Sequence, residues 1–155
     1  MFKKLLSILL ILILIFSLFG CIPAPTVEQP NLDVNEANET ETIAEDGVYT
    51  TPEEVAEYIH TYEKLPSNYL TKRQAMDLGW DSSKGNLWDV TDEGIIGGDK
   101  FGNREGLLPK ENGRTYYECD VNYEGGYRGA ERLVYSNDGL IFYTKDHYKS
   151  FKQLY

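Results

Sequence analysis

Cysteine and histidine are scarce in this sequence, which has two of each in 155 residues. The two cysteines, Cys21 and Cys119, are too few to build a disulfide scaffold or a zinc site made of thiolates. The fold must therefore be held by a hydrophobic core.

Basic residues are also in short supply. There are 15 Lys and Arg against 25 Asp and Glu, which gives a net charge of −10 at pH 7. This balance argues against attraction of the whole surface to nucleic acid or to an anionic membrane, although it is compatible with a local basic pocket.

Aromatic residues are plentiful: twelve Tyr, six Phe and two Trp supply enough buriable surface for one compact domain and exclude a uniformly disordered chain.

Long apolar runs are absent except at the N-terminus. There, 15 almost entirely apolar residues, Leu5–Phe19, follow two lysines; at ~1.5 Å per residue the run is shorter than the roughly 30 Å hydrocarbon core of a bilayer. We expect residues 1–20 to be an export signal. Leu18–Cys21 resembles a bacterial lipobox, which implies a lipid on Cys21. The alternative is an uncleaved membrane anchor, and in both cases the rest of the chain would lie outside the cell.

Residues 21–47 contain no Lys or Arg, seven acidic residues and three prolines. This composition is typical of a disordered, solvated tether. The alternative is that the acidic segment folds back on a basic pocket as a pseudo-inhibitor. The remaining residues, 48–155, carry 13 basic and 18 acidic side chains and form the expected working domain.

The domain opens with the signals of a helix. Thr51 suits the N-cap, Pro52 the first helical position and Glu54 the third. Apolar residues recur at i, i+3, i+4 and i+7 from Val55, which predicts one buried stripe. Glu63 lies near the expected C-terminus of the helix, where a negative charge is unfavourable.

Later segments predict two more short helices and then strands. Thr71 and Gln74 form a capping box for a helix that ends at Gly79, and a helical turn is expected over residues 87–90. Residues 115–123, 132–135 and 140–144 are β-rich, and a turn separates the last two. Helices followed by an antiparallel meander predict an α+β fold, in which N-terminal helices pack on a C-terminal antiparallel sheet.

The strand expected over residues 115–123 has two different faces. Alternation places Cys119 and Val121 on a core face, and Glu118 and Asp120 on a polar face. We therefore interpret Cys119 as a small buried hydrophobic residue rather than a nucleophile.

Cations cluster near these carboxylates in the predicted meander. Arg128, Arg132 and the segment Lys145–His147 come from its turns and strand ends. Lys72 and Arg73 occupy the first turn of the second helix, where the helix dipole disfavours cations, and such violations favour a functional role in anion binding. The alternative is that these long side chains simply extend into solvent.

Together these features resemble the barnase-like family of guanyl-preferring extracellular ribonucleases of bacteria, over residues 53–155. The segments that carry the resemblance are Tyr58–Tyr62, Lys64–Pro66, Thr71–Lys72, Leu78–Trp80, Ser83–Leu87, Gly97–Asp99, Phe101, Asn103–Gly106, Gly113–Thr115, Glu118, Asp120, Asn122–Tyr123, Arg128, Arg132, Tyr135–Ser136 and Asp146–Tyr148.

The resemblance implies the microbial ribonuclease fold and an endoribonuclease that needs no metal or other cofactor. Glu118 matches the general base and His147 the general acid, and the 2′-OH of RNA is the nucleophile. The product would be a 2′,3′-cyclic phosphate that is later hydrolysed. The residues that match the phosphate-binding cations are Lys72, Arg128 and Arg132, and those that match the guanine site are Phe101, Gly102, Asn103, Arg104, Glu105 and Tyr148.

Two other classes of function compete with this one. The same pocket would suit a binding module that captures RNA or protein without cleavage, and the N-terminal segment alone would suit a structural lipoprotein of the cell envelope. For the enzyme we expect RNA as substrate, a barstar-like acidic inhibitor as a partner, and a monomeric state. We also expect the protein to be attached through its N-terminus to the outer surface of the cell, or else to be secreted.

Overall fold

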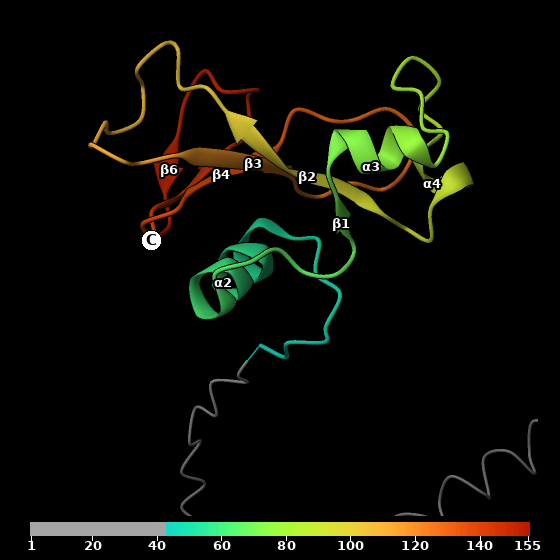
Figure 1. The fold of residues 1–155 in the computed structure, drawn as a ribbon, viewed down its shortest axis with the longest axis horizontal. Coiled ribbons are helices and arrows are strands. Elements are labelled where there is room, and N and C mark those ends of the chain that lie inside the picture. Colours follow the sequence, from blue (N-terminus) through green and yellow to red (C-terminus); the bar gives the residue numbers. More distant parts are fainter. Residues whose placement is uncertain (1–42) are drawn as a thin grey trace, which may run out of the picture. The chain divides into compact units, whose positions relative to one another are not determined.

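The computed structural model describes residues 43–155, so the predicted signal segment, Cys21 and most of the predicted tether lie outside the described residues. The described chain combines three helices with six strands (Figure 1). They are α2 (Pro52–Tyr62), α3 (Lys72–Asp77), α4 (Leu87–Val90), β1 (Tyr69–Leu70), β2 (Ile95–Phe101), β3 (Tyr116–Asp120), β4 (Arg132–Ser136), β5 (Ile141–Thr144) and β6 (Lys152–Gln153). This arrangement confirms the predicted α+β fold.

The strands form one sheet in the order β1-β2-β3-β4-β5-β6. All neighbours are antiparallel except β1 and β2, which are parallel because α3 and α4 lie in the connection between them. The predicted meander corresponds to β3–β5, whereas β1, β2 and β6 were not predicted as strands. Figure 1 shows α3 and α4 beside the β1–β2 end of the sheet.

Helix α2 begins and ends as its sequence predicts. The Thr51 hydroxyl accepts a hydrogen bond from the Glu54 backbone N–H, and Pro52 opens the helix. The cap at the other end is Glu63, whose φ of 55° is left-handed and whose backbone N–H donates to Ile59 O. A glutamate therefore occupies a position where glycine is usual.

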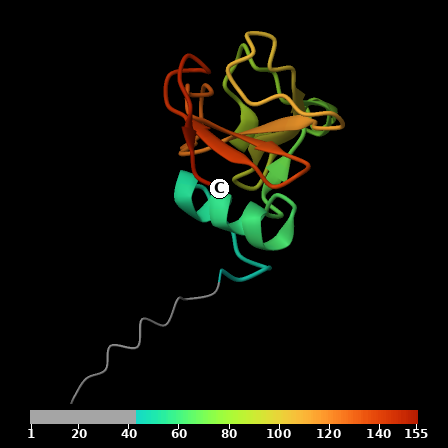
Figure 2. The same cartoon turned by 90° about the vertical axis from the view of Figure 1, so that its left-hand side faces the viewer.

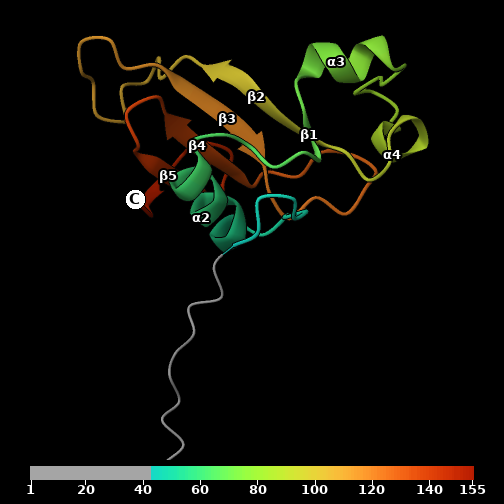
Figure 3. The ribbon, with the colours of Figure 1, turned by 60° about the horizontal axis from the view of Figure 1, so that its bottom comes forward.

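The main hydrophobic core lies between α2 and one face of the sheet (Figure 2). Val55 and Ile59 of α2 pack with Cys119 of β3, Leu133 of β4 and Ile141 of β5. Figure 3 shows α2 lying across this face. Because side chains alternate along a strand, β3 directs Glu118 and Asp120 to the opposite face, which α2 leaves open.

The opposite face is largely buried rather than a solvated polar surface. On it Tyr116 of β3, Val134 of β4, Phe142 of β5 and Leu108 from the β2–β3 loop form a second apolar cluster. Asp120 beside this cluster is only 2% exposed. The alternation predicted for β3 is therefore right, but both of its faces are covered.

Residues 43–47, the end of the segment predicted as a tether, pack against α2. The hydroxyls of Tyr62 and Tyr58 donate to the backbone carbonyls of Ile43 and Glu45 over 2.6 and 2.8 Å, and Ile43 is buried. Ordered packing thus includes these five residues of the predicted tether. Within residues 43–155 no helix combines the length and apolarity needed to cross a membrane.

Candidate active site

Glu118 lies at the centre of a cluster of charged and polar side chains on the face of the sheet opposite α2. Lys72 Nζ is 2.7 Å from one carboxylate oxygen, and the Tyr148 hydroxyl donates to the other over 2.7 Å. Burial alone would raise the pKa of Glu118, but the hydrogen bonds from Lys72 and Tyr148, with the charges of Lys72 and Arg128, lower it below its ordinary value. The carboxylate is therefore ionised at neutral pH.

Asp120, two residues further along β3, holds two arginines beside this carboxylate. Arg128 Nε and Nη2 donate to its two oxygens over 2.6 Å each. Arg132 Nε lies 2.8 Å from Oδ1 as an ion pair, although it is not aligned as a hydrogen bond with any residue in 43–155. Arg132 faces Asp120 across the β3–β4 ladder and is 3% exposed. Such a paired, rigidly packed guanidinium is well suited to bind phosphate.

Lys72 reaches the site because α3 begins beside the sheet. Thr71 and Gln74 form the predicted capping box, and Lys72 is the first helical residue. Its backbone N–H donates to Asp99 Oδ2 over 3.0 Å. Asp99 follows an irregularity in the β2–β3 ladder, where Gly98 adopts a φ of 90° that favours glycine. This anchor fixes the start of α3 against β2.

His147 and Tyr148 are presented by a tight loop that follows β5. Both have left-handed backbones, with φ of 56° and 69°, which strain residues other than glycine. Asp146 holds the loop, because its carboxylate accepts hydrogen bonds from Thr144 and from the backbone and hydroxyl of Ser150. These bonds lower the pKa of Asp146 to about 2. The loop can therefore keep its shape over the whole neutral and mildly acidic range.

Tyr148 links the predicted base to the predicted acid. Its hydroxyl contacts Glu118, and its ring lies 4.7 Å from the His147 ring, centroid to centroid. Burial raises the pKa of Tyr148, and the Glu118 carboxylate that accepts its hydrogen bond raises it further. The hydroxyl therefore stays protonated and continues to donate. His147 itself is exposed and faces solvent.

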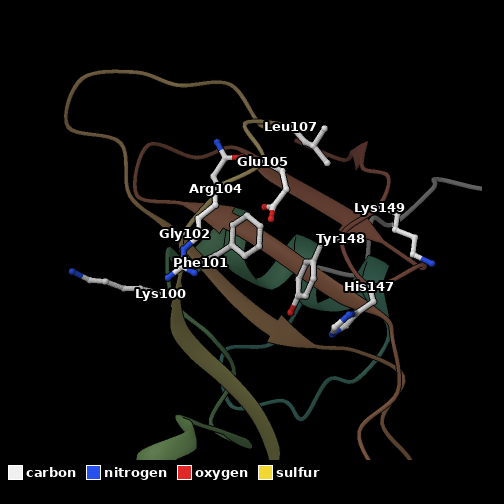
Figure 4. A pocket seen from close by; sticks show the side chains of 10 residues that line it. Lys100, Phe101, Gly102, Arg104, Glu105, Leu107, His147, Tyr148 and Lys149 are labelled. Carbon is white, nitrogen blue, oxygen red and sulfur yellow. The ribbon is translucent and has the colours of Figure 1, made fainter.

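A pocket of about 700 Å³ lies beside these groups. Its walls include the loop Phe101–Glu105 on one side, and His147 and Tyr148 on the other. The Phe101 and Tyr148 rings lie 5.2 Å apart, and the Glu105 carboxylate points toward them (Figure 4). The pocket thus places an acceptor and aromatic surfaces next to the Glu118 cluster.

The loop Phe101–Glu105 is braced from within. The Asn103 side chain donates to Leu108 O and accepts from Leu108 N over 2.9 and 3.1 Å, so its amide is used in shaping the loop. Arg104 runs past Gly102, away from the Phe101 and Tyr148 rings (Figure 4). All the predicted guanine-site residues line this pocket, but the Asn103 amide is hydrogen-bonded within the loop and the Arg104 side chain extends away from the rings.

All the predicted site residues of the described range therefore belong to one surface, formed by the Glu118 cluster and this pocket. Three acidic residues that organise it, Asp99, Asp120 and Asp146, were not predicted to have roles. Cys119 is buried on the other face and its burial raises its thiol pKa, in keeping with a structural residue.

An ionised carboxylate, a histidine beside the same pocket and three cations define a site for acid–base chemistry on an anionic centre such as a phosphodiester. The family comparison agrees with this chemistry, since a family model described as ribonuclease matches residues 52–155. The chain belongs to the ribonuclease family.

Individual relatives show how far the similarity extends. A ribonuclease of Bacillus intermedius is 44% identical over 160 residues, which cover 98% of this chain and 99% of the relative. A ribonuclease of Heyndrickxia coagulans is 53% identical over 107 residues, 69% of this chain and 98% of the relative. The guanyl-specific ribonuclease St of Saccharopolyspora erythraea is 40% identical over 70 residues, 44% of this chain and 65% of the relative.

Proposed function

We propose that this ribonuclease is an extracellular, guanyl-preferring endonuclease that cleaves single-stranded RNA without a metal ion. The observation that carries the proposal is the hydrogen-bonded cluster of Glu118 with Lys72 and Tyr148, next to a pocket that also contains His147. This set supplies a base, an acid and positive charge. The 2′-OH of the substrate supplies the nucleophile, so no nucleophilic protein side chain is needed.

In the first step, Glu118 removes the proton from the 2′-OH while the 2′-oxygen attacks phosphorus. The bond from phosphorus to the 5′-oxygen breaks, and the His147 imidazolium protonates that oxygen. The products are a 2′,3′-cyclic phosphate and a chain with a free 5′-OH. The ionised state of Glu118 supports its role as the base, and the exposure of His147 at the pocket supports its access to the departing 5′-oxygen.

In the second step, the roles reverse. Water attacks the cyclic phosphate, His147 accepts the proton from water, and the protonated Glu118 returns its proton to the departing 2′-oxygen. A 3′-phosphate results. Lys72, Arg128 and Arg132 stabilise the additional negative charge that develops on the phosphorane oxygens in both steps.

Guanine preference is assigned to the loop Phe101–Glu105. Glu105 offers a carboxylate that can accept from the N1 and N2 groups of guanine, and backbone N–H groups of the loop can donate to O6. The Phe101 and Tyr148 rings, 5.2 Å apart, provide apolar surface beside the base. The name of the guanyl-specific Saccharopolyspora relative supports this assignment.

Location and partners follow from the N-terminal segment and from the charge of the site. The apolar run and Cys21 support export, followed by attachment to the outer surface of the cell through a lipid or an uncleaved membrane anchor. The cations of the site support recognition by an acidic, barstar-like inhibitor. We propose a monomer as the active form.

The test is incubation of the full-length chain with oligoribonucleotides in EDTA. The proposal predicts cleavage on the 3′ side of guanosine and much slower cleavage when inosine, which lacks the N2 amino group, or adenosine replaces it. The matched control is an oligonucleotide with 2′-deoxyguanosine at that position, which must stay intact. Binding of RNA without cleavage would contradict the proposal and favour a binding module on the same fold.

A further inference from the structure

A second cavity, of about 600 Å³, borders the guanine loop on its other side. It shares the wall Lys100–Arg104 with the first pocket, but His147 and Tyr148 do not line it. Its remaining walls come from the β2–β3 loop and the start of β3. We call this cavity the outer cleft; the residues that complete its lining are Pro109, Lys110, Glu111, Arg114, Thr115 and Tyr116.

The outer cleft is basic on a strongly acidic protein. Four of its lining residues are cationic and one, Glu111, is acidic, whereas the whole chain has a net charge of −10. Arg114 is engaged, since it donates to Asp138 over 2.7 Å and to Pro109 O. Lys100, Arg104 and Lys110 are exposed and make no ion pair with another residue in the range 43–155. Three cations are therefore available to an anion.

The Lys100 and Arg104 side chains lie on the side of the loop Phe101–Glu105 that faces away from the first pocket's aromatic rings. In Figure 4, Lys100 and Arg104 extend away from the paired rings of Phe101 and Tyr148. The carboxylate of Glu105, by contrast, points toward those rings. Arg104 passes over Gly102, where an added Cβ would lie 3.5 Å from its Cγ. The guanine loop thus separates the catalytic groups from a cluster of cations.

We propose that the outer cleft binds the phosphates of nucleotides on the 5′ side of the guanosine, an inference that rests on the proposed function. The 3′-phosphate of the bound guanosine must lie at Glu118 to react, and its base occupies the loop. A strand that continues from the 5′-oxygen leaves on the other side of the loop, where Lys100, Arg104 and Lys110 lie. Two lysines and an arginine are suited to the backbone of any sequence, because phosphate contacts carry no base information.

The consequence is that substrate length on the 5′ side sets efficiency. A dinucleotide that begins with guanosine has no phosphate for the outer cleft, whereas RNA with several preceding nucleotides fills it. Because the protein is acidic, its long-range attraction to RNA is weak. The outer cleft would then favour guanosines that lie inside a strand, since only these have phosphates on their 5′ side.

The test compares wild type with the variant Lys110→Gln of the full-length chain, because Lys110 lines the outer cleft and not the first pocket. Two substrates are used: GpU, and GpU with three uridines added on its 5′ side. We expect the extension to raise kcat/KM of the wild type and the variant to lose about 1.4- to fivefold on the extended substrate, the range for one exposed charge contact. Activity on GpU should be unchanged. The dependence of log kcat/KM on log salt should become shallower by about 0.7 for the extended substrate alone.

The matched control is Lys152→Gln, which removes the same charge from an exposed lysine that does not line the cleft and, like Lys110, makes no ion pair in the range 43–155. Equal losses in both variants, a loss on GpU, or a benefit only from uridines on the 3′ side would overturn the proposal. A parallel measurement keeps it separate from the proposed function. Binding of a 2′-deoxyguanosine oligonucleotide, which cannot be cleaved, must weaken in the cleft variant even if the wild type proves inactive.

Discussion

Tyr148 has the most connected position among the residues of the site. Its hydroxyl lowers the pKa of Glu118, and its ring contacts both Phe101 in the proposed guanine pocket and His147. A single side chain thus joins the proposed base-recognition loop to the two groups proposed to transfer protons. Its hydroxyl and its ring contribute separately, and substitution can separate them.

Tyr148→Phe keeps the ring and removes the hydrogen bond to Glu118. Since that bond lowers the pKa of Glu118, its loss raises the pKa, and the carboxylate becomes protonated at a higher pH than in wild type. We expect the acid limb of the pH profile of kcat/KM to move to higher pH, with the loss of activity greatest below about pH 5 and smaller at pH 8. A uniform loss at all pH values would contradict this role for the hydroxyl.

Glu118→Gln and His147→Ala remove the proposed base and acid. Each should reduce kcat on a guanosine oligonucleotide by at least about a hundredfold, the usual scale for a single proton-transfer group. Circular dichroism and thermal unfolding must show that both variants remain folded. Near-normal turnover by either folded variant would mean that the roles are assigned wrongly.

Among the elements, helix α2 carries an avoidable cost at its C-terminus. Glu63 is left-handed there and places a negative charge at the negative end of the helix dipole. Glu63→Gly removes both penalties, and we expect the free energy of unfolding to rise by about 1 kcal/mol. Urea unfolding measures this, with Glu57→Gly in the exposed middle of the helix as a control that should be destabilised. A stability of Glu63→Gly at or below wild type would contradict the account.

The helices could be predicted because their signals are local. Thr51 and Thr71 act as N-caps as their sequences indicate, and α4 is a single turn at the predicted residues. Strand β2 could not be predicted in the same way, since IIGGDKF has no alternation and its ladder is irregular at Gly98. The two-residue strands β1 and β6 carry too little pattern to indicate pairing.

The site was predictable only in part for the same reason. The base, acid and cations come from residues that resemble a known family, whereas their organisers act through long-range contacts. Asp99 meets Lys72 across 27 residues and Tyr148 meets Glu118 across 30. The burial of Asp120 depends on its two arginines, and nothing in the local sequence of β3 indicates that pairing.

The distribution of charge over the protein matters more for RNA binding than the total charge. The net charge of −10 gives little long-range attraction to RNA, yet three basic residues lie in the Glu118 cluster and four more line the outer cleft. Binding is therefore expected to depend on a few local phosphate contacts, and to lose affinity with salt less steeply than binding by a generally basic protein.

The order in which products form distinguishes attack by the 2′-OH from direct attack by water. It can be followed by mass spectrometry during cleavage, in EDTA, of an oligoribonucleotide with one internal guanosine. A mechanism that uses the 2′-OH as nucleophile, with Glu118 as base and His147 as acid, predicts that a guanosine 2′,3′-cyclic phosphate appears first and converts more slowly to a 3′-phosphate. Two results would contradict this mechanism. One is a 3′-phosphate that appears directly, with one oxygen from labelled water and without a cyclic intermediate. The other is a 5′-phosphate on the released fragment.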